Sequence, residues 1–574
     1  DAVDGARFVP AALTVVTPPW NFPVAIPAGS TLAALAAGSA VVIKPAPQAE
    51  RCGAVMVETL WAAGVPREVL KLVQVGENTL GQQLIAHPAV DRVILTGGFE
   101  TAELFRSFRT DLPLLAETSG KNAIIVTPSA DLDLAVKDVV NSAFGHAGQK
   151  CSAASLVILV GSVATSRRFH NQLVDAVSSL KVGYADEATT QMGPIIEPAA
   201  GKLLSGLTEL GAGERWLVEP KQLDDTGRLW SPGVRAGVTR GSHFHLTEFF
   251  GPVLGIMTAA TLEEAIAIQN QVDYGLTTGL HSLNSAEIGL WLETIQAGNL
   301  YVNRGTTGAI VQRQPFGGWK RSAVGPGTKA GGPNYLVGLG SWTTQPSTAT
   351  APVTHTTVRA LLSATKASGL VDDAGLAFLE RAASSDAAAW AAEFGTAKDV
   401  SALTAERNVF RYRPAEVHVR LAGTSDNTSP ASFDSDSLAR LVRTLMAAAV
   451  AGARVHVSSP VALPDVILHV AARINASFAV ESNEAWLRAA SKLRNTRVRL
   501  LDGDEVETAT ATASAEATAR ALGFATDGRP DLAVYANPVT ESGRVELLPF
   551  LKEQAISITA HRFGTPNALS DGLL

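Results

Sequence analysis

The chain has 574 residues, of which 46% are hydrophobic and 18% are charged, and its formal net charge is −7. This length and composition exclude a disordered protein and a single small domain, and they predict a soluble, cytoplasmic protein with more than one hydrophobic core. The acidic balance gives no indication of nucleic-acid binding. Two cysteines, Cys52 and Cys151, provide neither a disulfide framework nor a metal-ligand spacing, so no metal site is expected.

The first strands are predicted from an uncharged segment at residues 8–43. Five prolines interrupt this segment, so no continuous helix of about 20 residues fits and we expect no transmembrane segment. The pattern instead predicts a strand over 13–17, a short helix from about Gly29 and a strand over 40–44. The chain begins at Asp1 with no Met and no signal-like segment, as a piece of a longer protein would.

Up to about residue 340, β-rich runs alternate with helical stretches. The runs are LTVVT (13–17), SAVVIKP (39–45), LKLVQVG (70–76), VDRVILTGG (90–98) and NAIIV (122–126). This alternation is typical of a parallel α/β sheet. Several of the runs end in Gly, Pro or Thr, at the edge where such sheets bind nucleotides.

A Ser/Thr/Pro-rich segment at 341–358 predicts a linker to a second α/β region. Two segments of that region match earlier ones: 30–46 aligns with 444–460, and 300–308 aligns with 556–564. An Ala-rich helix followed by a Val-rich strand also recurs by chance in α/β proteins. Two matches in the same order nevertheless favour an internal duplication.

Cys151 lies in FGHAGQKCSAAS, on a predicted loop ahead of the β-rich run SLVILV. A lone cysteine is more often a small buried residue than a nucleophile, so its interpretation depends on other segments. Asn21 follows a strand in a Pro-rich turn, where its amide either donates to an oxyanion or stabilises the turn. Glu117 ends a strand, where a carboxylate serves as a general base or caps a turn.

Further motifs accompany Cys151, Asn21 and Glu117 along the chain. WNFP, KPA, TGG, ETSGK, GQKC, EFFGP and PFGG occur here in the order found in the aldehyde dehydrogenase superfamily, which the chain therefore resembles. AGQKCSA, GNLYVNRGTTGAIV and KAGGPNYL resemble its L-glutamate γ-semialdehyde (pyrroline-5-carboxylate) dehydrogenase branch. Residues 405–414 and 543–569 resemble the tail of proline utilization A, a bifunctional family of proline-oxidising enzymes.

The resemblance implies an α/β aldehyde dehydrogenase fold, in which a Rossmann-like NAD-binding domain precedes an α/β catalytic domain and a degenerate aldehyde-dehydrogenase-like domain follows. The expected boundaries are 1–119 for the NAD-binding domain, 120–325 for the catalytic domain, 326–343 for an oligomerisation segment, 344–358 for the linker and 359–574 for the last domain. In the second copy Ser458 stands at the position of Lys44, and residues 355–574 contain no cysteine. We therefore expect that domain to be non-catalytic, to pack over the catalytic module and to help seal a substrate tunnel.

The same resemblance assigns roles to individual residues. Cys151 would be the nucleophile, Glu117 the base that activates water, and Asn21 an oxyanion donor together with the Cys151 backbone N–H. The implied cofactor-binding residues are Thr17, Trp20, Lys44, Ala46, Gln48, Gly76, Gly81, Thr96, Gly97, Gly98, Glu248 and Phe250. The implied substrate-binding residues are Phe22, Ser152, Gly308, Ala309 and Phe316.

Several positions depart from the family pattern. Gly98 stands where serine is usual, and Ser119 stands where glycine is usual, beside the base. Pro47 replaces a glutamate that contacts the adenosine ribose in many members, which leaves the choice between NAD and NADP open. The turn VGENTLG is one residue longer than usual, which affects the assignment of Gly76 and Gly81.

The activity implied is NAD-dependent oxidation of L-glutamate γ-semialdehyde to L-glutamate, the second step of proline catabolism. One alternative is a dehydrogenase for another ω-semialdehyde acid, and a second is a non-catalytic assembly fragment. The expected partners are the small-molecule substrate, a further copy of the chain in a homo-oligomer, and an upstream proline dehydrogenase domain. FAD is expected only where that upstream domain is present.

Overall fold

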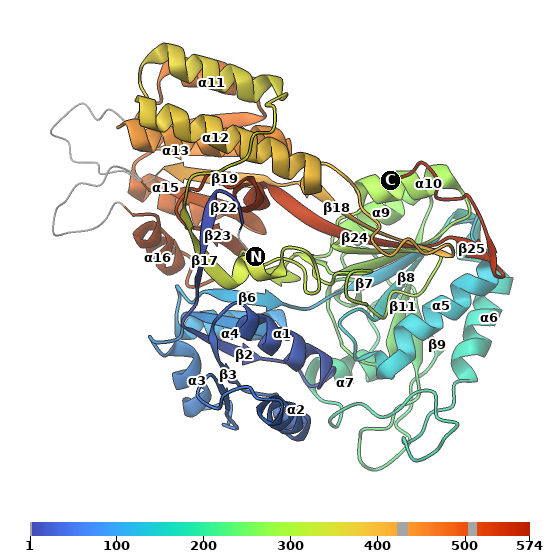
Figure 1. The fold of residues 1–574 in the computed structure, drawn as a ribbon. Helices are drawn as coiled ribbons and strands as arrows, with labels where there is room; N and C mark the ends of the chain where they lie inside the picture. The colour runs from blue at the N-terminus through green and yellow to red at the C-terminus, as the bar shows by residue number, and fades with distance from the viewer. Residues whose placement is uncertain (1–2, 422–433, 503–513) are drawn as a thin grey trace.

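The computed structural model describes residues 3–421, 434–502 and 514–574, and most of its strands belong to three sheets (Figure 1). In Figure 1 the blue N-terminal sheet, the cyan and green middle sheet and the orange and red C-terminal sheet occupy different regions of the molecule. The expected α/β fold is therefore confirmed. Across these residue ranges, every helix is too short or too polar to cross a membrane.

The N-terminal sheet has the strand order β16-β6-β5-β2-β3-β4. Its strands are β2 (Leu13–Thr17), β3 (Ala40–Ile43), β4 (Leu70–Leu72), β5 (Arg92–Thr96), β6 (Leu114–Glu117) and β16 (Ala323–Val324), and its helices are α1 (Ala25–Ala36), α2 (Glu50–Ala62), α3 (Thr79–Ala86) and α4 (Phe99–Phe108). The first five strands are parallel and β16 is antiparallel to β6. Taken along the chain, the parallel strands follow the order 3-2-1-4-5 of dinucleotide-binding folds.

Helix α1 begins at Ala25, four residues before the expected start at Gly29. Pro27 lies in its first turn, where backbone N–H groups have no partner within the helix, so a proline there removes no hydrogen bond. The strand expected over 13–17 is confirmed as β2. The runs 39–45 and 70–76 form shorter strands than their length suggested, ending at Ile43 and Leu72.

The middle sheet has nine strands in the order β18-β24-β14-β13-β7-β8-β11-β10-β9. Its strands are β7 (Asn122–Val126), β8 (Ala154–Val160), β9 (Arg215–Val218), β10 (Gly233–Ala236), β11 (Val253–Ala259), β13 (Thr277–His281), β14 (Asn299–Val302), β18 (Glu406–Pro414) and β24 (Leu551–Thr559). Its helices are α5 (Leu132–Phe144), α6 (Arg167–Ser178), α7 (Gly201–Thr208), α8 (His243–Leu246), α9 (Leu262–Asn270) and α10 (Ser285–Thr294). The central strands are buried on both faces, as the continuous apolar runs of parallel strands predict.

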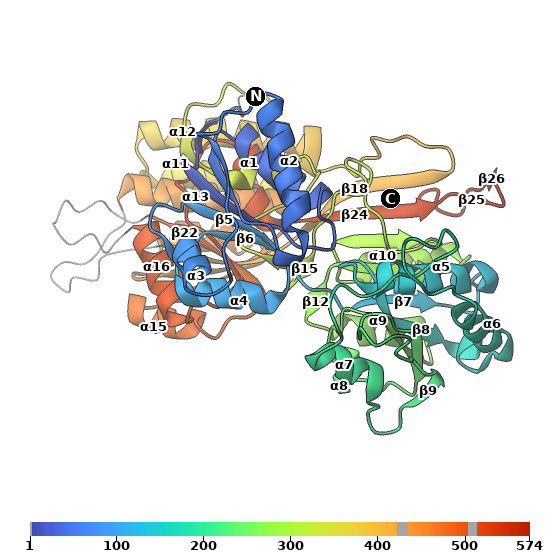
Figure 2. The ribbon, with the colours of Figure 1, turned by 90° about the horizontal axis from the view of Figure 1, so that it is seen from below.

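The sheets cross the expected domain boundaries in two places. Strand β24 pairs in parallel with β14, and β18 pairs with β24, so residues expected in the last domain extend the catalytic sheet. Figure 2 shows this pair reaching from the C-terminal half alongside the green and cyan strands. In the other direction, residues 323–324 fall within the range expected for the catalytic domain but pair with β6 in the N-terminal sheet.

The C-terminal sheet has the order β21-β20-β19-β22-β23, with all neighbours parallel. Its strands are β19 (Glu416–Leu421), β20 (Arg454–Ser459), β21 (Ala476–Val480), β22 (Thr496–Leu501) and β23 (Leu532–Tyr535). Its helices are α11 (Thr356–Ser368), α12 (Asp373–Ala389), α13 (Ser435–Ala451), α14 (Asp465–Ala471), α15 (Asn483–Ala490), α16 (Ala515–Ala525) and α17 (Gly543–Glu546).

This C-terminal order is again 3-2-1-4-5, as in the N-terminal sheet, which supports the duplication inferred from the sequence. The aligned segments 30–46 and 444–460 contain the end of the first crossover helix and the second strand of each sheet, α1 with β3 and α13 with β20. The other aligned pair behaves differently, because Leu300 and Ile556 are direct neighbours in the β14–β24 register. Those two segments lie side by side in one sheet and do not occupy equivalent places in two.

Three two-stranded pairs complete the fold: β1 (Ala6–Pro10) with β17 (Gly340–Thr344), β12 (Tyr274–Gly275) with β15 (Trp319–Lys320), and β25 (His561–Arg562) with β26 (Thr565–Pro566). The expected linker at 344–358 is therefore shorter, because Thr344 ends β17 and α11 begins at Thr356. The Asp4 carboxylate accepts a 2.8 Å hydrogen bond from the Thr348 backbone N–H, which ties the linker to the N-terminal segment.

Candidate active site

A cavity of about 1340 Å³ brings together many of the predicted site residues. It is lined by Trp20, Asn21, Thr96, Gly97, Gly98, Glu117, Cys151, Glu248, Phe250, Ala309 and Phe316, together with residues of the C-terminal half such as Arg497 and Glu553. Its lining does not include Thr17, Phe22, Lys44, Ala46, Gln48, Gly76, Gly81, Ser152 or Gly308. The candidate nucleophile, base and oxyanion donor therefore open into one space.

The loop that carries Cys151 is held through its backbone carbonyl groups. The Asn122 side-chain amide donates a 2.7 Å hydrogen bond to the Cys151 carbonyl. The hydroxyls of Thr306 and Thr277 donate to the carbonyl of Ser152, at 3.0 and 3.3 Å. No sequence motif marks Asn122, Thr277 and Thr306 as positioning residues, because only strand pairing brings them to this loop.

The Cys151 thiol is protonated in this environment. Burial, together with the nearby carboxylates of Glu248 and Glu117, raises its pKa to about 12, although the backbone N–H groups of Ser152 and Cys151 partly oppose the shift. Since the thiolate is the nucleophilic form, the thiol must lose its proton before it attacks an electrophile. The site therefore requires a base close to the sulfur.

Glu117 is suited to be that base. It ends β6, and one of its carboxylate oxygens accepts a 3.3 Å hydrogen bond from the Gly318 backbone N–H. Burial is the main reason that its pKa is raised to about 8; the Lys329 ammonium and the Gly318 N–H limit the rise, and the Glu553 carboxylate contributes to it. A carboxylate whose pKa lies close to neutral pH accepts and releases protons efficiently at physiological pH.

The pH dependence of turnover follows from this pKa. A base acts only when ionised, so we expect kcat to rise as pH increases through about 8 and to level off above it. Lys329 lowers the pKa of Glu117, so Lys329→Met should move the midpoint of the rise to higher pH. Lys320→Met, which removes a lysine that lines the same cavity but bonds the carbonyls of Asn270 and Val272, should leave it in place. Steady-state kinetics across pH would refute the assignment if the Lys329 variant kept the wild-type midpoint.

Gly317 leaves room for the Glu117 carboxylate. A Cβ at this position would lie 2.7 Å from a Glu117 carboxylate oxygen and 3.2 Å from the Lys329 Cα. We expect Gly317→Ala to displace the base and to lower kcat about 100-fold, within the range that general-base catalysis contributes. Gly193→Ala is the matched control, because a Cβ there meets nothing within 4 Å. Equal kcat values for the two variants would show that the position of Glu117 does not matter.

Asn21 is fixed against the nucleophile loop. Its side-chain amide donates a 3.0 Å hydrogen bond to the Gln149 carbonyl, two residues before Cys151. The Gln149 side chain is itself held, because it accepts from the Ile196 N–H at 3.0 Å and donates to the Phe250 carbonyl at 3.3 Å. An amide has two donor hydrogens, so one remains to stabilise negative charge that develops in the cavity.

One end of the cavity has the features of a nucleotide site. Trp20 and Phe250 meet edge to face, with ring centroids 5.8 Å apart, and Glu248 accepts a 2.9 Å hydrogen bond from the Gly120 N–H. Helix α4 begins after Gly98, which lines the cavity, so its N-terminus faces the same space. Aromatic edges, a carboxylate for hydroxyl groups and a helix N-terminus for phosphate together fit a dinucleotide.

Three further predicted cofactor residues lie outside the cavity lining. The Lys44 ammonium is 3.7 Å from the exposed Glu77 carboxylate. Gln48 donates a 2.8 Å hydrogen bond to Glu197, and Ala46 precedes the short 3₁₀ turn that contains Gln48. The cofactor contacts proposed for these three residues therefore stay predictions.

The other predicted cofactor residues, Gly76, Gly81 and Thr17, make contacts within the N-terminal sheet and its helices. A Cβ on Gly81 would lie 2.8 Å from the Gly76 carbonyl oxygen, so glycine permits the close approach of α3 to the preceding turn. Thr17 is buried at the end of β2, and its hydroxyl donates to the Ile94 carbonyl at 3.3 Å. Their roles toward a cofactor also stay predictions.

The predicted substrate residues are divided between the cavity and its surroundings. Ala309 and Phe316 line the cavity, whereas Phe22 stacks on His146 with ring centroids 6.0 Å apart. Gly308 has a φ of 96°, a left-handed conformation that favours glycine, and open space around it. The glycine thus lets the loop turn just before Ala309 enters the cavity.

The unusual Ser119 is accommodated by the structure. It is buried, and its hydroxyl accepts a 3.3 Å hydrogen bond from the Phe99 N–H at the start of α4 and also bonds the Glu248 carboxylate. Its carbonyl accepts from the Ser322 hydroxyl at 2.7 Å. The side chain that replaces glycine is therefore satisfied and does not obstruct Glu117.

Comparisons with known proteins agree with this geometry. A family model described as "Aldehyde dehydrogenase family" matches residues 5–339. The chain is 38% identical over 339 residues to a 1-pyrroline-5-carboxylate dehydrogenase of Geobacillus sp. (strain WCH70), an alignment that covers 58% of this chain and 65% of that protein. It is 37% identical over 332 residues to the protein of the same name in Bacillus subtilis (strain 168), covering 56% and 64%.

Solved structures extend the likeness to the C-terminal half. Proline utilization A from Corynebacterium freiburgense is 44% identical with a TM-score of 0.81, and the match covers 98% of this chain but 51% of that one. A 1-pyrroline-5-carboxylate dehydrogenase from Thermus with bound NAD is 34% identical with a TM-score of 0.55, covering 59% of this chain and 66% of that one. The chain thus spans about half to two thirds of the length of these relatives.

Proposed function

Because the chain belongs to the aldehyde dehydrogenase family, we propose that it oxidises L-glutamate γ-semialdehyde to L-glutamate with NAD. The observation that carries the proposal is the opening of Cys151, Glu117 and Asn21 into one cavity. The names of the dehydrogenase relatives support the choice of substrate, and the match to proline utilization A supports a place in proline oxidation.

The chain's own residues account for the covalent steps. Glu117 takes the thiol proton, and the Cys151 sulfur forms a bond to the aldehyde carbon, whose oxygen becomes negatively charged. The Asn21 amide and the Cys151 N–H stabilise that oxygen, and each such donor is worth about 10²- to 10³-fold in rate. Loss of hydride leaves a thioester on Cys151. Glu117 gives up the thiol proton to solvent and then removes a proton from water. The oxygen of that water bonds to the thioester carbon, the C–S bond breaks, the carboxylic acid leaves, and the sulfur takes the proton back from Glu117 as the thiol is regenerated.

Trp20, Glu248, Phe250 and the N-terminus of α4 would hold the NAD. When bound, NAD supplies the hydride acceptor and a positive ring charge that favours the Cys151 thiolate. The α-carboxylate of the substrate would be held by the backbone amide of Ala309, which lines the cavity, with Gly308 and Ser152 as its supports from the adjoining positions of the two loops. FAD would be bound only where an upstream proline dehydrogenase domain is present, and the protein would form a homo-oligomer.

Substrate comparison tests the proposal. With NAD, we expect kcat/KM for glutamate γ-semialdehyde to exceed that for butanal, which lacks the amino-acid head, by about 100-fold or more, because the carboxylate-binding amide would be left unpaired. A preference for succinic semialdehyde would instead favour another ω-semialdehyde acid. If no aldehyde reacts and NAD fails to quench tryptophan fluorescence, the chain is a non-catalytic fragment and the proposal fails.

A further inference from the structure

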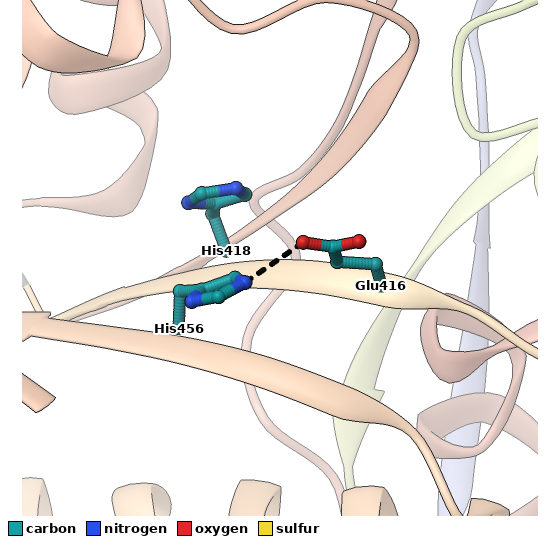
Figure 3. Close-up of side chains that lie close together, drawn as sticks. All are labelled: Glu416, His418 and His456. Atoms are coloured by element: carbon teal, nitrogen blue, oxygen red, sulfur yellow. Dashed lines mark hydrogen bonds and ion pairs between the residues drawn. The ribbon is translucent and has the colours of Figure 1, made fainter. Parts of the chain in front are cut away.

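Two histidines and a glutamate meet on one face of the C-terminal sheet (Figure 3). Glu416 and His418 are two positions apart on β19, so their side chains point to the same face. His456 on the neighbouring strand β20 is paired directly with His418 in the parallel register. One ligand atom from each of the three lies within 4.8 Å of the others.

The contacts around this group orient two of its members. The His456 Nε2 lies 2.8 Å from a Glu416 carboxylate oxygen. The other ring nitrogen of His456 lies 2.7 Å from the hydroxyl of Ser477, its register partner on β21. A hydrogen bond to the second imidazole nitrogen is the usual means by which proteins orient a metal-binding histidine.

His418 takes no part in the ion pair between His456 and Glu416. Its ring lies against that of His456, with centroids 4.8 Å apart and 28° between the planes. Within the described part of the chain, no hydrogen bond is made by either of its ring nitrogens. The direct register of the two strands places this second imidazole beside the first, where its ring nitrogens stay available to a metal ion.

We propose that Glu416, His418 and His456 bind a divalent metal ion of the zinc class. Two imidazole nitrogens and one carboxylate oxygen form a ligand set that zinc uses at sites with an open coordination position. The spacing of these residues in the sequence does not indicate the site, because His418 and His456 lie on different strands with a crossover helix between them. The parallel pairing of β19 and β20 creates it.

The geometry of the group fits an ion of this size. Zinc ligands at about 2.1 Å in a tetrahedron lie about 3.4 Å apart, so the side chains must close by at most about 1.4 Å from their 4.8 Å limit. Small rotations of the partly exposed Glu416 and His456 side chains would achieve this.

Open positions on the ion would be accessible. The Glu416 and His456 side chains are 51% and 26% exposed, so water can complete the coordination. Glu416 and His418 also line the cavity that holds Cys151, although they belong to the C-terminal half. The proposed ion would therefore lie in the wall of that cavity.

Zinc binding to the metal-free chain tests the proposal. Because thiols also bind zinc, the measurement uses the Cys52→Ala/Cys151→Ala variant, stripped with chelator and dialysed against zinc chloride. We expect one zinc per chain by elemental analysis. In that background His418→Ala and His456→Ala should each weaken binding at least 100-fold by calorimetric titration, and Glu416→Gln should weaken it less, since the amide oxygen is an uncharged ligand.

His469→Ala is the matched control, an exposed histidine on α14 of the same half that lies outside the group, and it should bind zinc as tightly as the parent. Thermal unfolding followed by circular dichroism identifies variants that fail to fold. If a histidine variant fails to fold, the isosteric Glu416→Gln variant is used to measure the loss of zinc binding. The proposal is overturned if the folded parent binds no zinc, or if binding survives the loss of His418 and His456.

Discussion

Replacement of Cys151 by alanine is expected to lower kcat/KM for aldehyde oxidation by about 10⁴-fold or more. The variant cannot form the thiohemiacetal, and removing a covalent nucleophile costs far more than removing a single hydrogen bond. NADH formation followed by absorbance, with glutamate γ-semialdehyde as substrate, measures the loss. NAD binding should persist, because Trp20, Glu248 and the N-terminus of α4 are unchanged.

The second cysteine is a natural control for this experiment. Cys52 is exposed on α2, and the cavity lining does not include it. Cys52→Ala should therefore keep wild-type kcat/KM. Activity that survives in Cys151→Ala, or that disappears in Cys52→Ala, would show that Cys151 is not the nucleophile.

Replacement of Glu117 by glutamine should separate the two halves of the reaction. Without a base for water, thioester hydrolysis should slow by about 10²- to 10⁴-fold. Stopped-flow measurement with enzyme pre-incubated with NAD, whose positive ring charge favours the Cys151 thiolate, should then show a burst of NADH of about one equivalent per site, followed by a slow steady state. The burst is expected because hydride leaves before water attacks.

Glu58→Gln is the control for this variant, since Glu58 is exposed on α2 and does not line the cavity. It should show wild-type kinetics. If the Glu117→Gln enzyme shows no burst, Glu117 acts before hydride transfer, as the base that deprotonates the thiol, and its role in hydrolysis is not supported. Unchanged turnover would remove it from the mechanism.

Much of the fold was predictable because its signals are local. The apolar runs gave β2, β7 and β8 nearly to the residue, and the aligned segments 30–46 and 444–460 located a helix and strand in each of two sheets with the same strand order. The start of α1 was misplaced, because prolines usually exclude a helix and the tolerance of its first turn for Pro27 was overlooked.

The candidate site was predictable where the chemistry lies in short motifs and not where it depends on strand pairing. Cys151, Glu117 and Asn21 were found through their motifs and open into one cavity. Asn122 and Lys329 were missed as partners of the nucleophile loop and the base, because they reach them through contacts between distant segments. The extension of the catalytic sheet by β18 and β24 was missed for the same reason, since edge pairing leaves no periodic signal.

The most direct measurement is mass spectrometry of the Glu117→Gln variant, pre-incubated with NAD so that the Cys151 thiolate is favoured and then mixed with glutamate γ-semialdehyde. The account predicts a glutamyl thioester on the peptide that contains Cys151, present with NAD and missing without it. It also predicts no such adduct in Glu117→Gln/Cys151→Ala. An adduct on another residue, or none on Cys151 while NADH is still formed, would contradict the proposed covalent mechanism.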